Sequence, residues 1–295
     1  MLEYSPTPIQ PIDDPSLIAA GVQLFVKRED LNHPYVSGNK WWKLKMNLTR
    51  ALTEGHDQIL TFGGAFSNHI YATAAAAKAV GLRSVGIIRG EEPVPLNSTL
   101  RFADDCGMQL HFISRATYRN KDETLLSTLI SKFGRCYIIP EGGSNEPGVA
   151  GVAAFSEQLS GDFDFICCPI GTGATMAGLI RGRHGAGQLI GFAVLKGGDA
   201  WNEAIKHFNP GYSNWITITN YHFGGYAKTN ATLEQFIKRF AADKNVPLEH
   251  VYSGKMFYGI MELVSNGYFP RGSRILAIHT GGLRSNDYTW KDIGN

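Results

Sequence analysis

The chain has 295 residues, beyond the size at which a single hydrophobic core usually stops growing, so two lobes are expected. Hydrophobic residues make up 43% of the chain and charged residues 18%, which excludes a disordered or collagen-like protein. The 28 basic and 26 acidic side chains are scattered and give a net charge of only +2. Nucleic acid is therefore not an expected partner.

The sequence also predicts a soluble, cytoplasmic protein. No apolar run approaches the roughly 20 residues that cross a bilayer, and the N-terminal segment has neither a basic start nor an apolar stretch, so no membrane partner is expected. The cysteines lack the spacing of zinc ligands or of a disulfide scaffold. We expect them to be reduced core thiols: Cys106, Cys136, Cys167 and Cys168.

Short apolar, β-branched runs alternate along the chain with longer segments of helical periodicity. Strands are predicted, in chain order, at 24–27, 58–62, 84–89, 109–113, 136–139, 163–169, 189–195, 215–219 and 274–279. Helices are predicted at 40–54, 68–80, 98–106, 121–133, 175–181, 232–244 and 255–266. This alternation is typical of mostly parallel sheets covered by helices, so the predicted fold class is α/β.

Glycine is over-represented in the composition: 34 of the 295 residues are glycine, whereas the usual share is roughly 7%. Many of the glycine clusters follow a predicted strand and precede a helix, where the open ends of parallel strands form a ligand crevice. Function is therefore expected at these turns. The clusters are Gly63-Gly64, Gly142-Gly143, Gly171 with Gly173, Gly197-Gly198, Gly224-Gly225 and Gly281-Gly282.

The run FICCPIGTGATMAGLI combines a buried strand, a glycine-rich turn and the start of a helix. Backbone N–H groups and the positive end of a helix dipole suit such a turn to a phosphate, although a tight turn without a ligand is an equally simple interpretation. A dinucleotide fingerprint fits poorly, because Met176 stands where Gly or Ala is required and no acidic residue follows at the expected distance.

Two further segments carry candidate functional residues. In TFGGAFSNHIYATAAAA, the side chains of Ser67 and Asn68 could cap a helix or, with free N–H groups, hold a carboxylate. In VKREDLNHPYVSGNKWWKLK, Lys40 follows Gly38-Asn39 and precedes Lys43 by one helical turn. A lone lysine is usually a solvated surface charge. Patterns for metal ligation, a serine nucleophile or a redox dithiol are absent from the sequence, so no metal is expected.

The order of these segments is more specific than any one of them. The succession SGNKWWKLK, TFGGAFSNH, IPEGGSN, GTGATMAGL, VYSGKMFYGI and IHTGGL resembles the pyridoxal-phosphate enzymes of the tryptophan-synthase β-like fold, fold type II. Within this fold it is most similar to the aminocyclopropane-carboxylate deaminase and D-cysteine desulfhydrase branch. The resemblance implies two lobes, with residues 1–42 and 151–295 forming a large cofactor-binding domain and residues 43–150 a small mobile domain.

The resemblance also implies roles for individual residues. Lys40 is expected to bind pyridoxal 5'-phosphate covalently and to move the proton at the substrate's α-carbon. The substrate carboxylate is expected to bind Ser67 with Asn68 and His69, and Tyr226 and Tyr252 are expected to face the substrate. The remaining cofactor-binding residues are expected to be Asn39, Lys43, Asn68, Thr172, Gly173, Ala174, Thr175, Ser253 and Thr280.

The same resemblance implies a lyase or deaminase that acts on a small amino acid, as a homodimer. Ring-opening deaminases of the family typically have glutamate at the position of Ser253 and leucine at that of Thr280. D-cysteine desulfhydrases have serine and threonine at these two positions, as this chain does. D-cysteine is thus the expected substrate and aminocyclopropane carboxylate the alternative. Trp42 and Phe66 depart from the family pattern and are expected to reshape the pocket. A nucleotide-dependent oxidoreductase and a non-catalytic ligand-binding homologue remain alternatives.

Overall fold

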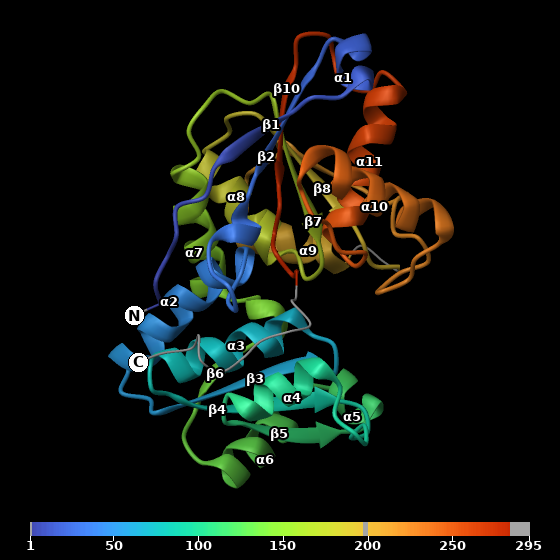
Figure 1. The fold of residues 1–295 in the computed structure, drawn as a ribbon. Coiled ribbons are helices and arrows are strands. Elements are labelled where there is room, and N and C mark those ends of the chain that lie inside the picture. Colours follow the sequence, from blue (N-terminus) through green and yellow to red (C-terminus); the bar gives the residue numbers. More distant parts are fainter. Residues whose placement is uncertain (1, 197–199, 284–295) are drawn as a thin grey trace.

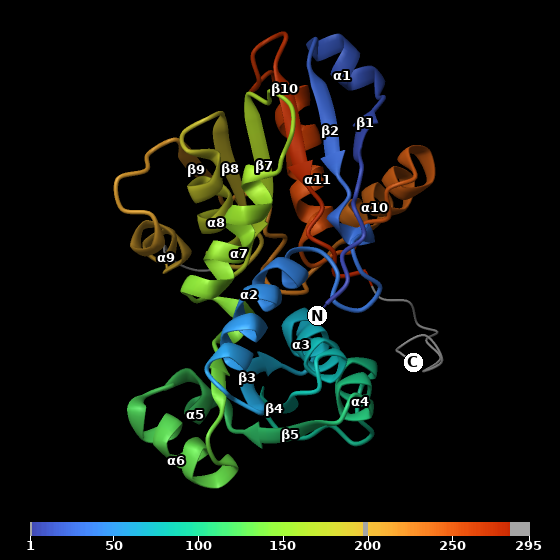
Figure 2. The ribbon, with the colours of Figure 1, turned by 90° about the vertical axis from the view of Figure 1, so that its left-hand side faces the viewer.

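The computed structural model describes residues 2–196 and 200–283, so the Gly197-Gly198 pair lies outside the described residues. The chain forms two α/β lobes, each built around its own sheet (Figure 1). A six-stranded sheet lies in the upper lobe of the view and a four-stranded sheet in the lower one, and Figure 2 shows the same two lobes from the side. Within the described residues, no helix is long and apolar enough to span a membrane.

The larger sheet is parallel except at one edge. Its strand order is β1 (Ile9–Ile12), β2 (Gln23–Lys27), β10 (Arg274–Ile278), β7 (Phe165–Ile170), β8 (Gln188–Ala193) and β9 (Trp215–Ile218). Only β1 runs antiparallel to its neighbour. Alternate side chains enter two separate cores, so the adjacent Cys167 and Cys168 of β7 are buried on opposite faces.

Helices cover both faces of this sheet. One face packs against α7 (Glu146–Glu157) and α8 (Ala174–Arg183), and the other against α1 (Pro15–Ala20), α10 (Ala231–Lys244) and α11 (Ser253–Ser265). Helix α9 (Ala200–Phe208) follows β8 and contacts α8. A parallel sheet buried on both faces needs near-continuous apolar strands, as the run FICCPI of β7 provides.

The smaller sheet is entirely parallel. Its order is β5 (Met108–Ile113), β4 (Arg83–Arg89), β3 (Gln58–Gly64) and β6 (Tyr137–Ile139). Helices α3 (Asn68–Ala79) and α4 (Ser98–Asp105) pack on one face, and α5 (Arg115–Arg119) and α6 (Glu123–Phe133) on the other. All four strands fall within the predicted small domain, whose exact boundaries stay a prediction.

Helix α2 (Asn39–Thr53) joins the lobes and packs along α7. The two helices approach closely because Gly151 has no side chain: a Cβ atom there would lie 2.0 Å from the Trp42 carbonyl oxygen. This packing brings the start of α2, with Lys40, to the boundary between the sheets (Figure 1).

The predicted α/β class is confirmed, and each predicted strand and helix forms with ends shifted by at most two residues. Several elements were not predicted: β1, α1, α5, α7, α9 and two short 3-10 helices, η1 (Glu29–Leu31) and η2 (Glu141–Gly143). Strand β1 contains Pro11, which is tolerated because β1 is an edge strand. Helix α7 contains two glycines and lacks a clear polar face, so its periodicity is weak.

Candidate active site

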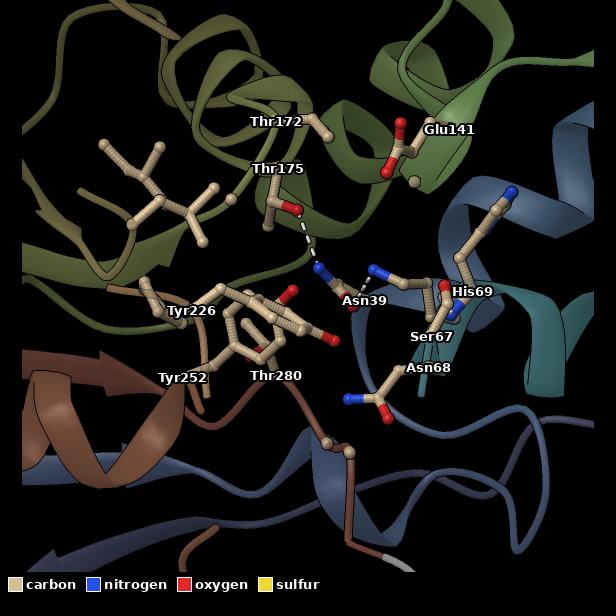
Figure 3. A pocket seen from close by; sticks show the side chains of 18 of the residues that line it. Asn39, Ser67, Asn68, His69, Glu141, Thr172, Thr175, Tyr226, Tyr252 and Thr280 are labelled. Carbon is tan, nitrogen blue, oxygen red and sulfur yellow. Dashed lines mark hydrogen bonds between the residues drawn. The ribbon is translucent and has the colours of Figure 1, made fainter. Parts of the chain in front are cut away.

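A cavity of about 470 Å³ lies between the two sheets, at the carboxyl ends of their parallel strands. Its volume falls within the range typical of small-molecule sites. Side chains converge on it from both lobes: Ser67, Asn68 and His69 from the start of α3, and Tyr226 and Tyr252 from the larger lobe opposite (Figure 3). The open ends of parallel strands are where α/β proteins bind their ligands.

The turn before Lys40 is locked in place by backbone contacts. Gly38 has φ +68°, and a Cβ atom there would lie 1.8 Å from the carbonyl oxygen of Thr280, so only glycine fits. The Gly38 amide donates to Asn32 Oδ1 at 2.8 Å and to Glu29 O at 2.9 Å. The Asn39 amide donates to Thr280 O at 3.3 Å. These contacts fix the start of α2 against the end of β10.

Lys40 lies in the cavity wall. Its ammonium nitrogen donates to Asn39 Oδ1 at 3.3 Å, and the Asn39 amide nitrogen donates to Thr175 Oγ1 at 2.7 Å. Figure 3 shows both hydrogen bonds, which run from the lysine to the first turn of α8. Burial lowers the pKa of Lys40 to about 8. A lysine with this pKa is partly neutral near physiological pH and can act as a nucleophile or base.

Lys43 is the second cation at this site and is almost fully buried. Its ammonium nitrogen donates to the Gly142 carbonyl oxygen at 3.1 Å. Burial, and then repulsion from Lys40, hold the pKa of Lys43 well below its ordinary value. Bringing an anion beside it would offset both effects, so the position is suited to a bound phosphate.

The glycine-rich turn after β7 leads into α8 without a side-chain cap. Gly173 occupies the N-cap position with φ +88°, and among the described residues no side-chain hydrogen bond caps the start of α8. Thr172 and Thr175 line the cavity together with Gly173. The side chain of Ala174 is buried and points elsewhere, so Ala174 can contribute only its backbone. An uncapped helix N-terminus beside Lys43 is suited to a dianion.

The start of α3 differs because it caps itself. Ser67 Oγ accepts from the backbone amides of His69 at 3.1 Å and Ile70 at 3.3 Å. The capping interpretation of Ser67 is thus confirmed, yet its hydroxyl hydrogen remains a donor toward the cavity that Ser67 and Asn68 line. The two interpretations of this turn, helix cap and carboxylate clamp, are compatible.

His69 is buried in a fixed orientation. Its Nε2 lies 2.8 Å from Thr61 Oγ1, and that hydroxyl donates to Ile139 O at 2.8 Å. Nε2 must therefore carry the hydrogen, which leaves Nδ1 as an acceptor, and the buried Nδ1 has no hydrogen-bond partner within the described part of the chain. Burial, and then Lys40 and Lys43, hold the pKa of His69 well below its ordinary value, so the ring is neutral.

Two tyrosines and a threonine line the opposite wall. The rings of Tyr226 and Tyr252 meet edge to face, with centroids 6.5 Å apart. The Tyr226 hydroxyl donates to the Phe66 carbonyl oxygen at 3.4 Å and so reaches across the cavity to the smaller lobe. Thr280 lines the cavity at the end of β10. All three residues line the cavity, and their contacts with substrate or cofactor stay predictions.

Ser253 does not reach the cavity, in contrast to the role predicted for it. Its side chain is fully buried, and its hydroxyl donates to Glu249 Oε1 at 3.0 Å. The Glu249 carboxylate also accepts from the backbone amides of Val251, Tyr252 and Ser253, and so caps α11. The difference arises because Tyr252 and Ser253 are adjacent at the start of a helix and their side chains point in different directions.

The expected effect of Trp42 and Phe66 on the pocket is also not observed, since neither lines it. The indole nitrogen of Trp42 donates to the buried Glu29 carboxylate at 2.7 Å. The Phe66 side chain is 64% exposed. Both departures from the family pattern therefore lie outside the cavity wall.

The cavity wall carries more positive than negative charge. Beyond Lys40 and Lys43, it includes Arg89 at the end of β4 and Lys196 and Lys228 from the larger lobe. Its one carboxylate among the described residues is Glu141, which pairs with Lys121 at 2.9 Å. The sequence analysis missed Arg89 and Glu141, although both follow strands of the smaller sheet and the rule for parallel-strand ends would have found them. An anionic ligand is favoured here.

These residues fit pyridoxal 5'-phosphate. The uncapped turn of α8 and the buried Lys43 are suited to its phosphate, and a neutral fraction of Lys40 can bind its aldehyde. Asn39, Asn68 and Thr280 line the same cavity. Among the described residues, no cluster of three or more His, Cys, Asp or Glu side chains could hold a metal.

Comparison with known proteins agrees with this fit. The family described as "Pyridoxal-phosphate dependent enzyme" matches residues 1–281. A protein of Pyrococcus furiosus, provisionally named a 1-aminocyclopropane-1-carboxylate deaminase, is 31% identical over 94% of this chain and 89% of its own length. The Arabidopsis thaliana bifunctional D-cysteine desulfhydrase/1-aminocyclopropane-1-carboxylate deaminase is 31% identical over 96% of this chain and 77% of its own length.

Solved structures show the same fold. The crystal structure of a homologue of 1-aminocyclopropane-1-carboxylate deaminase superimposes with a TM-score of 0.81, at 28% identity, over 96% of this chain and 90% of that one. A pyridoxal 5'-phosphate-dependent aspartate racemase superimposes with a TM-score of 0.70 at 15% identity, which concerns the fold alone. The chain therefore has the fold type II architecture that the sequence predicts.

Proposed function

This chain belongs to the pyridoxal-phosphate-dependent enzymes, and within that family we propose that it eliminates sulfide from D-cysteine, giving pyruvate, ammonia and sulfide. Membership of the family excludes the alternative of a nucleotide-dependent oxidoreductase. The retained Lys40, with a pKa of about 8, argues against a homologue that only binds ligands. A cytoplasmic location and a homodimeric assembly stay predictions of the same proposal.

Different residues of the chain are assigned to different parts of the cofactor. When bound, pyridoxal phosphate withdraws electrons from the substrate's α-carbon and so makes its proton removable. We assign its covalent attachment to Lys40 and its phosphate to Lys43 and the turn at 172–175, where N–H donors and a buried cation meet. Asn39 and Asn68 are assigned to orienting the cofactor.

Ser67 and the amides at the start of α3 are assigned to the substrate carboxylate. The Ser67 hydroxyl has a hydrogen to donate, and the positive end of the α3 dipole favours a negative charge there. Asn68 and His69, which line the cavity beside Ser67, are assigned to the same side of the substrate site.

Proton transfer is assigned to Lys40 and the tyrosine pair. Lys40 in its neutral form removes the α-proton. The sulfur departs from the β-carbon with the electron pair of the broken C–S bond, and the phenol of Tyr226 or Tyr252 can protonate it. Water then hydrolyses the remaining three-carbon product to pyruvate and ammonia, so that no oxidant or reductant is needed.

The single observation that supports elimination over ring opening is Thr280 in the cavity wall beside this tyrosine pair. The family pattern has leucine at this position in ring-opening deaminases and threonine in D-cysteine desulfhydrases. Ser253 no longer adds to this argument, because it lies outside the cavity. A second candidate, the ring-opening deaminase, is favoured by the names of several relatives.

A substrate panel tests the proposal. The purified holoenzyme is incubated with D- and L-cysteine, D- and L-serine and 1-aminocyclopropane-1-carboxylate, and pyruvate, 2-oxobutanoate, ammonia and sulfide are measured. We expect sulfide and pyruvate from D-cysteine in equal amounts, with little product from the cyclopropane. Ring opening at a comparable or greater kcat/KM would establish the second candidate instead.

A further inference from the structure

Lys255 is a fully buried lysine to which the proposed reaction gives no role. It lies in the first turn of α11, with no exposed surface. Its ammonium nitrogen donates to three backbone carbonyls: Val194 O at 3.3 Å, His222 O at 2.9 Å and Gly225 O at 2.6 Å. An ammonium group has three N–H donors, so each of its hydrogens has a partner.

The carbonyls that meet at Lys255 come from two separate segments. Val194 directly follows β8, next to residues that line the cavity. His222 and Gly225 belong to a tight loop in which Phe223, Gly224 and Gly225 have φ values of +50°, +90° and +115°. A non-glycine residue in this region is intrinsically unfavourable, so surrounding contacts must hold the loop in shape.

Helix stability does not explain a lysine at this position. The first turn of a helix is its positive end, where a cation is unfavourable, and burial lowers the pKa of Lys255 to about 8. The nearby Glu249 carboxylate opposes this shift only in part. What a cation does here is to bind three converging carbonyl oxygens at once. Those of His222 and Gly225 each also accept one backbone amide, from Gly225 and Lys228, so the Lys255 N–H groups fill their remaining acceptor sites.

The loop held by Lys255 carries Tyr226 into the cavity. Gly224, Gly225 and Tyr226 all line the wall, and the Tyr226 hydroxyl reaches Phe66 O on the smaller lobe. Its ring contacts the ring of Tyr252, which is the N-cap residue of α11 and so lies at the same helix end as Lys255. The position of Tyr226 therefore depends on the shape of a loop whose backbone is tied to α11 by the Lys255 ammonium group, beside ring contacts of Phe223 with Tyr258 and of Tyr226 with Tyr252.

We propose that Lys255 is a positioning residue, a built-in cation that holds the loop at 222–226 so that Tyr226 faces the substrate. It touches neither cofactor nor substrate, and acts by ordering backbone. The step from loop order to substrate binding rests on the proposed function, whereas the ordering of the loop does not.

The test compares Lys255→Met with the wild-type holoenzyme. Methionine has an unbranched side chain that is one atom shorter than that of lysine and has no N–H donors. Hydrogen exchange measured by mass spectrometry should show faster exchange in 222–228, with the sheet strands as protected as before. Losing charge-assisted hydrogen bonds of this kind should lower kcat/KM by about tenfold or more, mainly through KM. The control is Lys238→Met, an exposed lysine of α10, which should change neither measurement.

Chemical rescue separates a cation site from a packing role. Lys255→Ala leaves a space lined by the same carbonyls, which added ammonium or methylammonium ions can occupy. These ions should restore protection of 222–228 and recover part of kcat/KM. Tetramethylammonium ions cannot donate hydrogen bonds and should do neither. Rescue absent with every ion, in a folded Lys255→Ala protein, would overturn the cation role.

A double-variant comparison tests the route through Tyr226. Once Tyr226→Ala has removed that side chain, Lys255→Met should lower kcat/KM little further. The proposal would be overturned if the losses in kcat/KM of the two single variants multiplied fully in the double variant. It would also be overturned if hydrogen exchange in 222–228 were unchanged in folded Lys255→Met. Should Lys255→Met not fold, Lys255→Leu, which also has no N–H donors, takes its place with the same outcomes. Exchange is measured without substrate, so it decides the question even if D-cysteine proves not to be the substrate.

Discussion

The side chain of Asn39 donates a hydrogen bond to Thr175 Oγ1 over 2.7 Å. One partner begins α2, directly before Lys40, and the other lies in the first turn of α8, beside the proposed phosphate site. The same Asn39 amide accepts from Lys40 at 3.3 Å. The two places where the cofactor would be held are thus connected by a single side chain.

Asn39→Ala should therefore weaken cofactor retention while leaving the fold intact. It removes one donor to Thr175 and one acceptor for Lys40, and a buried hydrogen bond contributes about 1 kcal/mol, so affinity should fall roughly tenfold. The measurement is the cofactor absorbance that remains after dialysis. Asn120→Ala, at an exposed position on the smaller lobe, is the control. Equal retention in both variants would show that the Asn39 contact is dispensable.

Covalent capture of the cofactor should depend on the protonation state of Lys40. Its pKa of about 8 means that the amine is mostly protonated, and unreactive, below pH 8 and mostly neutral above it. The rate at which apoprotein is labelled by pyridoxal phosphate and borohydride should therefore rise as the pH passes about 8. In Lys40→Ala this labelling and all turnover should be lost, whereas Lys132→Ala should resemble the wild type. Undiminished labelling in Lys40→Ala would place the reactive lysine elsewhere.

The same lowered pKa affects the stability of the apoprotein. Between the folded pKa of about 8 and the ordinary value of 10.5, the unfolded chain binds more protons at Lys40 than the folded chain, so stability rises with pH across this window. Below it, the cost of burying the charge is fully present. Lys40→Met apoprotein should unfold at a higher temperature than the wild type at pH 7, and the difference should shrink toward pH 10. A difference independent of pH would point to packing instead.

Gly173 is the position at which the phosphate turn is most sensitive to substitution. A Cβ atom there would lie 3.1 Å from the Trp201 carbonyl oxygen, and φ is +88°. Gly173→Ala should lower cofactor affinity by about tenfold or more, because the turn must open and its N–H groups shift. Gly81→Ala is a matched control: its φ is +73°, but nothing lies within 4 Å of the added Cβ. Similar cofactor affinity in the two variants would move the phosphate site elsewhere.

The sequence predicts the parts of this site that are strictly local. The segments around Lys40 and Ser67 each begin a helix after a strand or tight turn. Contacts between segments that are distant in the sequence could not be predicted from it. Only the folded chain shows that Thr280 lies against Gly38, and nothing near Lys255 indicates that its partners are 30 or more residues away.

Helix α7 and Ser253 show two other limits. The glycines of α7 lower its helix propensity, and the role of Gly151, which allows close approach to α2, becomes visible only when the helices are packed. Its close approach to α8 depends instead on Gly178 and Gly182 of α8. Ser253 shares a motif with Tyr252, but only the structure shows that it faces Glu249 and not the cavity. Proximity in a motif does not establish proximity in a site.

Reaction choice should respond to Thr280 and not to Ser253. Thr280→Leu places a larger apolar group in the cavity wall beside the tyrosine pair and removes a hydroxyl, as in the ring-opening pattern of the family. We expect the ratio of D-cysteine elimination to cyclopropane opening, each measured as kcat/KM, to fall by about tenfold. The measurement is keto-acid release from both substrates.

Ser253→Glu should act by another route. It would bury a second carboxylate beside Glu249, at a position with no exposed surface, so it should lower the unfolding temperature of the protein by several degrees. It should not increase kcat/KM for opening of the cyclopropane ring. Ser253→Ala is the companion variant, which removes the hydrogen bond to Glu249 and adds no charge. If Ser253→Glu shifts the substrate ratio while Thr280→Leu does not, the residue at the start of α11 determines which bond is broken, and the placement of Thr280 in the wall does not.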